Sequence, residues 1–306
     1  MLRSVLLAAA RNKRVEHLVA SAPVSRDVVA RFVAGTSPED ARRVAAMLAG
    51  DGLAVSLDHL GEDTTDARSA AAARDAYTGL LAGLGAAGLT PAAEVSLKLS
   101  AVGQRLDERM ALDHARAICQ AAVNAGTTVT LDMEDHTTTD STLGVLAELR
   151  KDFPDTGVAV QAYLRRTEAD CRDLAVAGSR VRLCKGAYAE PESVAYQGGR
   201  DVGRSYVRCL NVLLGGAGYP MFATHDPRLV AIVEERARWY ERDTRSFEFQ
   251  LLYGIRPDEQ LRLAHDGYTV RVYLPYGDQW YAYLMRRLAE RPANMAFFLR
   301  ALSGTK

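Results

Sequence analysis

The sequence predicts an α/β protein, a distorted (β/α)₈ barrel of the TIM type that follows an N-terminal helical arm. From residue 51 onward, short apolar runs typical of strands alternate with longer amphipathic stretches typical of helices. Eight such units fit into about 250 residues, a common size for a closed barrel. No Pro/Ser-rich linker or low-complexity tract interrupts them. We therefore expect an arm at 1–50 and one barrel domain at 51–306.

The elements are predicted in chain order from their start signals and periodicity. In the arm, Pro23–Ala34 and Pro38–Ala49 each begin with proline in the first turn, and Ser37 precedes the second as its N-cap. The predicted strands are Ala54–Leu57, Val95–Leu99, Thr128–Leu131, Val158–Tyr163, Arg180–Cys184, Met221–Thr224, Ser246–Gln250 and Thr269–Leu274. Helices between them include Asp66–Leu84, Glu108–Asn124, Ser141–Lys151, Thr167–Ala177, Arg200–Leu214 and Pro227–Tyr240.

The composition excludes several functional classes. The 38 basic and 38 acidic side chains cancel, so no electrostatic surface for nucleic acid is expected. The four cysteines show no ligand spacing and are expected to be free thiols. No stretch approaches the roughly 18 apolar residues of a membrane span. We expect a cytoplasmic protein, with peripheral attachment at the inner face of the cell membrane as an alternative.

Polar side chains near the ends of the predicted strands indicate an enzyme. Active sites of such barrels lie at the carboxyl ends of the strands, and unpaired buried charges are costly. The polar residues in question are Asp58, His59, Lys98, Asp132, Glu134, Gln161, Arg182, Lys185, Thr224, His225, Asp226, Glu248, Gln250 and Tyr273. A set this complete is not required by a purely structural barrel.

A helix expected after the last strand carries a second cluster. Tyr283, Arg287 and Glu290 share one helical face, and Arg286 also neighbours Glu290. Two guanidinium groups could hold a small anion such as a carboxylate in a bidentate grip. The alternative is a solvated charged face with an ordinary Glu–Arg pair.

Other chemistries find less support in the sequence. The run DMEDH (132–136) contains four potential metal ligands, but acidic loop residues are more often solvated or paired, and no metal site is predicted. Neither a Rossmann fingerprint nor a P-loop occurs. Lys98 could form a Schiff base, yet the aspartate on the next strand would favour its charged form.

Several motifs together resemble monofunctional proline dehydrogenase, the flavin enzyme that also forms one domain of bifunctional proline utilisation proteins. The resemblance covers about Val55 to Leu299. Its motifs are SLDHLGE (56–62), SLKLSAVG (96–103), LDMED (131–135), VQAYLRRT (160–167), RLCKGAY (182–188), FATHD (222–226), FEFQLLYG (247–254) and RVYLPYG followed by YLMRRLAERPAN.

The resemblance implies a site for FAD and L-proline. It implies that Arg182 lies beside the flavin N5. The other implied FAD contacts are Gln161, Lys185, Gly186, Ala187, Tyr188, Thr224 and His225. Lys98, Arg286 and Arg287 would grip the proline carboxylate, while Tyr273, Tyr283 and Leu252 would line the ring and Asp132 and Glu290 would hold this polar set. Among these residues, the expected catalytic group is Lys98, Asp132, Arg182 and Tyr273.

The implied reaction is oxidation of L-proline to Δ1-pyrroline-5-carboxylate, by transfer of a hydride from C5 to flavin N5. This is the first step of proline catabolism to glutamate. Electrons would pass to a membrane quinone and the product to a separate pyrroline-5-carboxylate dehydrogenase. The alternatives are a hydroxyproline dehydrogenase of the same family, another flavin barrel enzyme, a barrel that binds FAD or senses proline without catalysis, and a Schiff-base lyase. The resemblance also implies a preference for proline over hydroxyproline, because the family's tyrosine at the position of Tyr273 leaves no room for a 4-hydroxyl.

Overall fold

The computed structural model describes residues 29–290, without the side chains of Arg286, Leu288, Ala289 and Glu290. Eight parallel strands close into one barrel in chain order, which confirms the predicted architecture. The strands are β1 (Ala54–His59), β2 (Ala93–Leu97), β3 (Val129–Leu131), β4 (Gly157–Gln161), β5 (Arg180–Cys184), β6 (Tyr219–Ala223), β7 (Glu248–Leu252) and β8 (Thr269–Tyr276).

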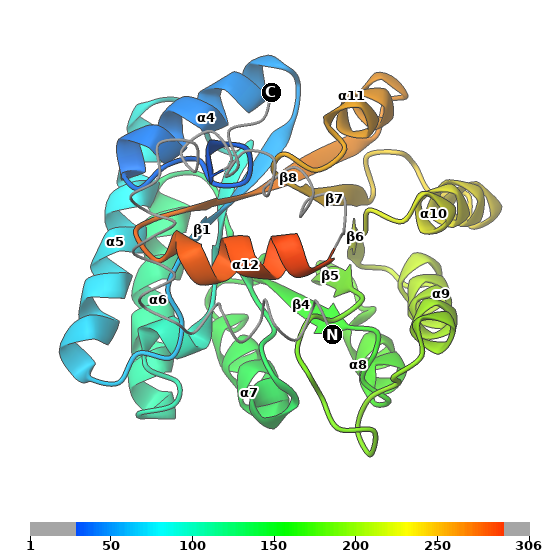
Figure 1. Cartoon of the computed structure of the whole chain (residues 1–306), viewed down its shortest axis with the longest axis horizontal. Coiled ribbons are helices and arrows are strands. Elements are labelled where there is room, and N and C mark those ends of the chain that lie inside the picture. Colours follow the sequence, from blue (N-terminus) through cyan, green and yellow to red (C-terminus); the bar gives the residue numbers. More distant parts are fainter. Residues whose placement is uncertain (1–28, 291–306) are drawn as a thin grey trace, which may run out of the picture.

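A ring of helices surrounds the barrel (Figure 1). These are α4 (Pro38–Gly50), α5 (Ala67–Ala86), α6 (Glu108–Asn124), α7 (Thr139–Leu149), α8 (Thr167–Leu174), α9 (Gly199–Gly215), α10 (Pro227–Trp239) and α11 (Pro257–His265), and α12 (Trp280–Glu290) follows β8. The short 3₁₀ turns Leu99–Val102 and His136–Thr138 follow β2 and β3.

The predicted boundaries differ from the observed ones by a few residues. Val95–Leu99 is displaced from β2 because Leu99 already begins a 3₁₀ turn, and Val158–Tyr163 outlasts β4, which ends at Gln161. Similarly, β7 begins and ends two residues later than predicted. Apolar runs continue beyond the paired backbone at strand ends, so periodicity alone does not locate the last ladder hydrogen bond.

Helix starts follow the expected side-chain chemistry. Ser37 caps α4 by accepting from the amide of Asp40, with Pro38 in the first turn. Asp66 and Asp226 cap α5 and α10 in the same way. Each cap satisfies amides that a helix leaves unpaired, which is worth about 1 kcal/mol.

Side chains along each strand alternate between two environments. Residues such as Val55, Leu57 and Leu183 are at most 1% exposed and pack with the helices in the main apolar cluster. Their neighbours, such as Ser56 and Arg182, point into the barrel, where Arg182 bonds the Ser56 hydroxyl. The barrel interior is therefore polar, although barrels of this type usually fill it with branched apolar residues.

The helical ring departs from the regular (β/α)₈ arrangement where β8 pairs with β1. Helix α4 packs on the outside of β1 and β8, whereas α12 crosses the middle of the view inside the helical ring (Figure 1). Tyr281 and Leu284 of α12 are buried in one cluster with Leu60, which directly follows β1, and with Phe32. Helix α12 thus lies at the carboxyl end of the barrel.

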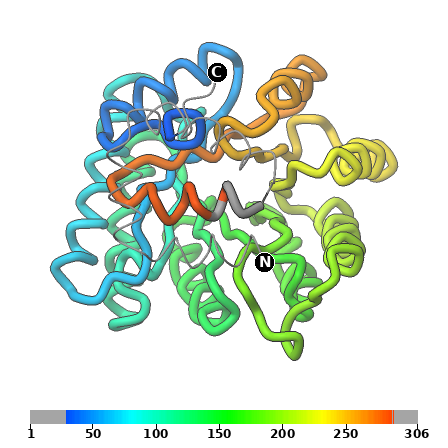
Figure 2. Tube along the Cα trace, in the orientation of Figure 1, coloured from blue at the N-terminus to red at the C-terminus, as the bar shows by residue number. Residues whose placement is uncertain are grey.

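The segment before α4 also reaches this end. The amide of Ala34 donates to the Pro275 carbonyl at 2.9 Å, and Figure 2 shows the dark-blue start of the trace beside the orange segment of β8. Residues 1–28 and 291–306 lie outside the described part, and with them the first half of the predicted helix Pro23–Ala34. In its second half only Val29 and Ala30 are helical, and the chain turns at residues 31–32, so the predicted helix extends too far. No helix within 29–290 is both long and apolar enough to cross a membrane.

Candidate active site at the carboxyl end of the barrel

Lys98 follows β2 and is held by two carboxylates. Its Nζ donates to both oxygens of Asp58 at 2.8 and 2.9 Å, and lies 3.4 Å from Asp132 Oδ2. Burial alone would lower the pKa of Lys98, but the charges of Asp58 and Asp132 outweigh it and raise the pKa well above its ordinary value. Lys98 is therefore a fixed ammonium group, as the sequence indicated.

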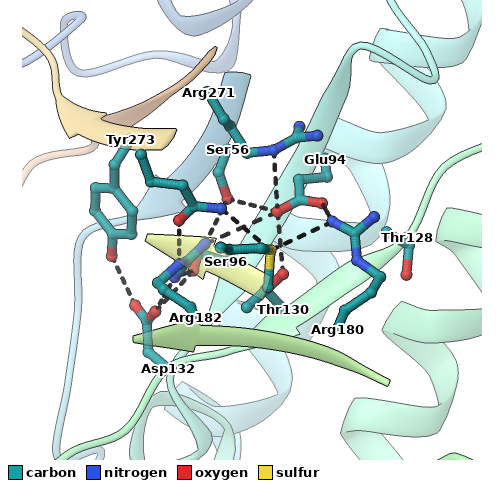
Figure 3. A network of polar contacts seen from close by, with 12 residues as sticks. Ser56, Glu94, Ser96, Thr128, Thr130, Asp132, Arg180, Arg182, Arg271 and Tyr273 are labelled. Carbon is teal, nitrogen blue, oxygen red and sulfur yellow. Dashed lines mark hydrogen bonds and ion pairs between the residues drawn. The ribbon is translucent and has the colours of Figure 1, made fainter. Parts of the chain in front are cut away.

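Asp132, one residue beyond β3, joins the predicted catalytic residues. Its Oδ1 accepts from Arg182 Nη1 at 2.6 Å, and its Oδ2 accepts from the Tyr273 hydroxyl at 2.7 Å (Figure 3). Burial raises the pKa of Asp132, but Lys98 and Arg182 overcome that effect and leave the pKa lowered. Burial and the nearby Asp132 charge raise the pKa of Tyr273 far above its usual range. These groups keep their charge states at neutral pH.

Arg182 extends from β5 across the barrel interior. Its Nη1 donates to Ser96 Oγ at 2.7 Å and its Nη2 to Ser56 Oγ at 3.2 Å, so it contacts residues on β1, β2 and β3. The guanidinium also lies 5.4 Å from the ring centre of Tyr273. We call Asp58, Lys98, Asp132, Arg182 and Tyr273 the upper ion cluster.

Deeper in the barrel lies a second group, the lower ion cluster of Glu94, Arg180, Glu248 and Arg271. Arg180 Nη2 bonds Glu94 at 2.6 Å, and Arg271 grips Glu248 with two bonds of 2.8 and 3.1 Å. Arg271 also lies 3.8 Å from Glu94. Figure 3 shows Glu94 between Arg180 and Arg271. Buried carboxylates persist when each is paired and hydrogen-bonded, as here.

The two clusters together balance their charge. Four cations, Lys98 and the three arginines, face four carboxylates in ion pairs of 4 Å or less. Burying such a set costs several kcal/mol per ion unless the pairing is complete. A ligand that brings a negative charge to this end must therefore find its compensating cations elsewhere or share Lys98.

Predicted cofactor residues occupy the opposite half of the barrel mouth. Gln161 ends β4, Lys185 follows β5, and Thr224 and His225 follow β6. The Gln161 amide nitrogen donates to the Glu134 carbonyl at 2.6 Å, which leaves its amide oxygen to accept from another group. Lys185 is 41% exposed and pairs with Asp226 at 3.1 Å. These residues lie at the ends of three neighbouring strands, β4 to β6, whereas the upper ion cluster lies at β8 and β1–β3 except for Arg182, which reaches it from β5.

His225 links two loops at this edge. Its Nε2 accepts from the backbone amide of Leu252 at 2.9 Å, and its carbonyl accepts from Arg256 at 3.1 Å. Leu252, predicted to line the substrate ring, ends β7 and is partly buried. The Thr224 hydroxyl accepts from the Asp226 amide at 3.2 Å, and Asp226 caps α10. Hydrogen bonds from Arg228 have the largest effect on the pKa of Asp226. They outweigh burial, which would raise the pKa, and hold it well below its usual range.

The loop after β5 is clasped to its neighbours. Gly186 has a φ of +114°, and a Cβ at this position would lie 2.3 Å from the ring of Tyr163. The Tyr163 hydroxyl donates to Glu190 at 3.2 Å, and Glu190 also accepts from the His136 amide at 2.9 Å and from the His136 ring. The loop containing the predicted contacts Ala187 and Tyr188, which are exposed and partly buried respectively, is thereby anchored.

Helix α12 brings two of the predicted substrate residues together. The Arg287 guanidinium lies 5.1 Å from the ring centre of Tyr283, whose side chain is 5% exposed. This agrees with the predicted shared face. The side chains of Arg286 and Glu290 lie outside the described residues, so their part of the cluster stays a prediction.

Two alternative chemistries lose support. A Schiff-base lysine must become neutral, but Lys98 is bound to two carboxylates as an ammonium. In the DMEDH run, His136 is paired with Glu190, and Asp135 with Arg105. Within residues 29–290, no group of three His, Cys, Asp or Glu side chains could hold a metal ion.

The predicted site set omitted several groups that complete the network. Asp58, Glu94, Glu248, Gln250 and Arg271 were left out, although some were noted as polar residues near strand ends. The sequence did contain a signal for these residues, because each falls at an inward position of a period-two strand pattern. Partners could not be assigned, since bonds such as Arg271 to Glu248 depend on the strand register.

The chain was compared with known proteins. Residues 41–300 match the family model described as proline dehydrogenase. Proline dehydrogenase of Deinococcus radiodurans is 40% identical over 305 residues, 98% of this chain and 97% of that protein. Proline dehydrogenase 1 of Bacillus subtilis is 36% identical over 99% of both chains. A solved proline utilization A from Bdellovibrio bacteriovorus, inactivated by N-propargylglycine, gives a TM-score of 0.82 at 25% identity, covering 92% of this chain and 34% of that one.

Proposed function

Since the chain belongs to the proline dehydrogenase family, a flavin-dependent family, it is an enzyme that oxidises proline to Δ1-pyrroline-5-carboxylate, and we propose how it does so. L-proline binds at the half of the barrel mouth formed by β8, β1, β2 and β3. FAD binds against the half formed by β4, β5 and β6. The observation that carries this proposal is that Gln161, Lys185, Thr224 and His225 follow β4 to β6, whereas Lys98, Asp132 and Tyr273 lie on or after β2, β3 and β8 of the same closed barrel, with Arg182 of β5 reaching from one arc to the other.

The residues present on the second arc fit a flavin. The Gln161 amide oxygen is left as an acceptor and Lys185 is a partly exposed donor, which suits a ring edge that alternates donors and acceptors. Thr224 and His225 line the neighbouring strand end, and Gly186 to Tyr188 supply backbone and ring surface. When bound, FAD would accept the hydride from proline C5 at N5, the chemistry that no side chain can provide.

The first arc fits a small amino acid with a carboxylate. Arg287 and Arg286 of α12 would supply two cations at this end of the barrel, and Lys98 adds a third, shared charge. Tyr273 and Tyr283 would form apolar walls for the pyrrolidine ring together with Leu252 at the end of the adjoining strand β7, and Glu290 would orient the arginines. Holding the carboxylate fixes the direction of C5, so that transfer becomes effectively intramolecular.

Charge states on this arc define what the residues do during the reaction. Oxidation removes a hydride from C5 and a proton from the ring nitrogen, leaving a C=N bond. Lys98 stays protonated and Asp132 stays ionised with its oxygens engaged. Neither is a competent base, so the amine proton leaves to water, and these residues bind and orient the substrate. Arg182 places a permanent positive charge beside the reacting atoms, which stabilises negative charge that develops there.

Further partners follow from the reaction itself. The two electrons removed need an acceptor, and a membrane quinone reached from the cytoplasmic face would serve. The product would be consumed by a separate pyrroline-5-carboxylate dehydrogenase. Both are part of the proposal, and each can be assayed by adding the partner to the purified enzyme.

The experiment that tests the cofactor assignment is release and identification of the bound flavin. Protein purified and denatured should yield FAD, and stripped protein should regain colour with FAD but not with FMN. Turnover is then measured with L-proline, D-proline and trans-4-hydroxy-L-proline. Turnover of L-proline alone supports the proposal, whereas equal turnover of hydroxyproline contradicts the role given to Tyr273.

A further inference from the structure

Gln250 lies inside the barrel on β7, between the upper and lower ion clusters. Its side chain is 3% exposed, and it touches one member of each cluster. The amide oxygen accepts from Arg182 Nε at 2.5 Å, and the amide nitrogen donates to Glu248 Oε1 at 2.5 Å. Its nitrogen also lies 3.2 Å from Met221 Sδ.

The partners of Gln250 leave it only one orientation. A guanidinium has donors and no acceptor, so it requires the amide oxygen. A carboxylate has acceptors and no donor when ionised, so Glu248 requires the amide nitrogen. Glu248 is in turn held by two bonds from Arg271. The lower ion cluster thus determines the orientation of the Gln250 amide, because Arg271 holds Glu248 and Glu248 accepts from the amide nitrogen.

Arg182 needs such support from below. Its Nη1 is anchored by Ser96 and Asp132, and its Nη2 by Ser56, all on β1 to β3. Gln250 holds Nε from β7 on the far side of the barrel. Without that bond, the guanidinium could rotate about its stem toward Asp132.

We propose that Gln250 is a positioning residue for the oxidation of proline, joining the buried Glu248–Arg271 pair to Arg182 and holding the Arg182 guanidinium in its working orientation. The inference rests on the proposed function, in which Arg182 stands beside the reacting atoms. It adds a residue that touches neither substrate nor cofactor.

Few other side chains could replace glutamine here. Leucine has similar size but leaves Arg182 Nε without a partner and leaves Glu248 Oε1 with Arg271 as its only donor among these groups, and a buried unsatisfied polar group is costly. A glutamic acid side chain can imitate the amide only while protonated, since its hydroxyl then donates to Glu248 and its carbonyl accepts from Arg182. Once ionised, it places a second negative charge against Glu248.

The charged groups around position 250 set the direction of this effect. Glu248 on β7 and Glu94 on β2 oppose ionisation of a new carboxyl, as does burial. Arg182 on β5 favours ionisation, while Arg271 on β8 is already paired with Glu248. Gln250→Glu therefore creates a carboxylic acid that is protonated at low pH and ionises as pH rises.

The test compares Gln250→Glu and Gln250→Leu with the wild type, using Gln120→Glu on the exposed face of α6 as control. Wild-type reduction by L-proline is established first, because its failure would contradict the proposed function and not this inference. The rate of flavin reduction is then measured across pH, with KM for proline, the midpoint potential of the bound flavin and thermal stability.

We expect Gln250→Leu to reduce the rate about tenfold or more with little change in KM, and to shift the midpoint potential. Gln250→Glu should approach the wild-type rate at low pH and lose it as pH rises, a limb absent from the wild type and from Gln120→Glu. If Gln250→Leu does not fold, the pH profile of Gln250→Glu decides alone. A wild-type profile in Gln250→Glu, or an equal loss at every pH that tracks thermal stability, overturns the inference.

Discussion

Lys98 has two roles at the scale of the single residue. Its ammonium neutralises Asp58, which is 1% exposed, and it also extends the proposed grip on the substrate carboxylate. Removing Lys98 therefore combines a stability effect with a binding effect. An uncompensated buried carboxylate costs about 3–5 kcal/mol, and one charge-assisted bond to substrate is worth about 1.5–3 kcal/mol.

Lys98→Met is expected to raise KM for L-proline about tenfold to a hundredfold and to lower the melting temperature. The double variant Lys98→Met with Asp58→Asn should recover most of the lost stability, since no buried charge remains unpaired, without recovering KM. Steady-state kinetics and thermal unfolding of both variants measure the two effects separately. Lys151→Met, which removes an exposed pair with Glu148, serves as the control. Recovery of KM in the double variant would show that Lys98 acts on the fold alone.

The sequence could predict a site residue only where the residue's position along its own strand already places it in the barrel interior. Lys98, Asp132, Arg182 and Tyr273 fall at inward positions near strand ends, and the structure brings all four within hydrogen-bond or ring contact. Asp58 was seen as a polar residue but not as the principal partner of Lys98. The pairing depends on β1 and β2 being neighbours in register, which hydrophobic patterning does not determine.

At the scale of the element, the loop after β5 is held through Gly186. Its φ of +114° disfavours any side chain, and a Cβ would meet the Tyr163 ring at 2.3 Å. Gly178, in the loop before β5, has a φ of +76° but no atom within 4 Å of its Cβ position. An alanine would strain the backbone at either position, but it would also meet a neighbouring side chain at position 186. Comparison of the two alanine variants therefore separates the two effects.

Gly186→Ala is expected to weaken FAD binding by tenfold or more, because the loop must move away from Tyr163 to admit the methyl group. Gly178→Ala pays only the backbone penalty of about 1 kcal/mol and should leave FAD affinity unchanged. Titration of stripped protein with FAD, followed by flavin fluorescence, provides the comparison. Equal affinities in the two variants would remove the loop from the cofactor site.

The clasp around Glu190 gives a second test of the same element. His136→Ala removes the ring that pairs with Glu190, whereas His136→Gln keeps a donor that can reach it. We expect faster FAD release from the alanine variant, partial recovery in the glutamine variant and unchanged KM for proline in both. The rate of FAD loss into excess apo-flavoprotein acceptor measures this. A glutamine variant no better than alanine would contradict a hydrogen-bonding role.

The position of helix α12 could not be predicted from the local sequence. The alternation of strands and helices was sufficient for the eight-stranded barrel, but not for the position of α12 across its mouth. That position follows from Tyr281 and Leu284 packing with Leu60 and Phe32, which are distant in sequence. Helical periodicity alone placed Tyr283 and Arg287 on one face, since it depends only on local geometry.

At the scale of the whole molecule, the barrel interior is an ionic core. Asp132 and Glu248 both have lowered pKa values: burial opposes ionisation, but Lys98 and Arg182 in one case and Arg271 in the other prevail. A lowered pKa in the folded state means that the unfolded chain binds protons first as pH falls. Their stabilisation is complete above the ordinary values of about 4 and is lost as pH falls through the lowered ones.

The free energy of unfolding should therefore decline below about pH 4 and remain level with respect to these two groups above about pH 5. Glu248→Gln should lower stability at neutral pH by about 3–5 kcal/mol, because Arg271 loses its charged partner, and should flatten part of the acid decline. Denaturant unfolding from pH 3 to 8 measures both effects. An acid decline in Glu248→Gln as steep as that of the wild type would show that Glu248 does not contribute to it.

The central claim is that this barrel delivers a hydride from L-proline to a flavin held on its opposite arc. The most direct test is the absorption spectrum of the purified protein before and after anaerobic addition of L-proline. We expect flavin bands at about 450 nm that bleach with L-proline and persist with D-proline. Bands that remain unchanged with L-proline, or a colourless protein that FAD cannot reconstitute, would contradict the account.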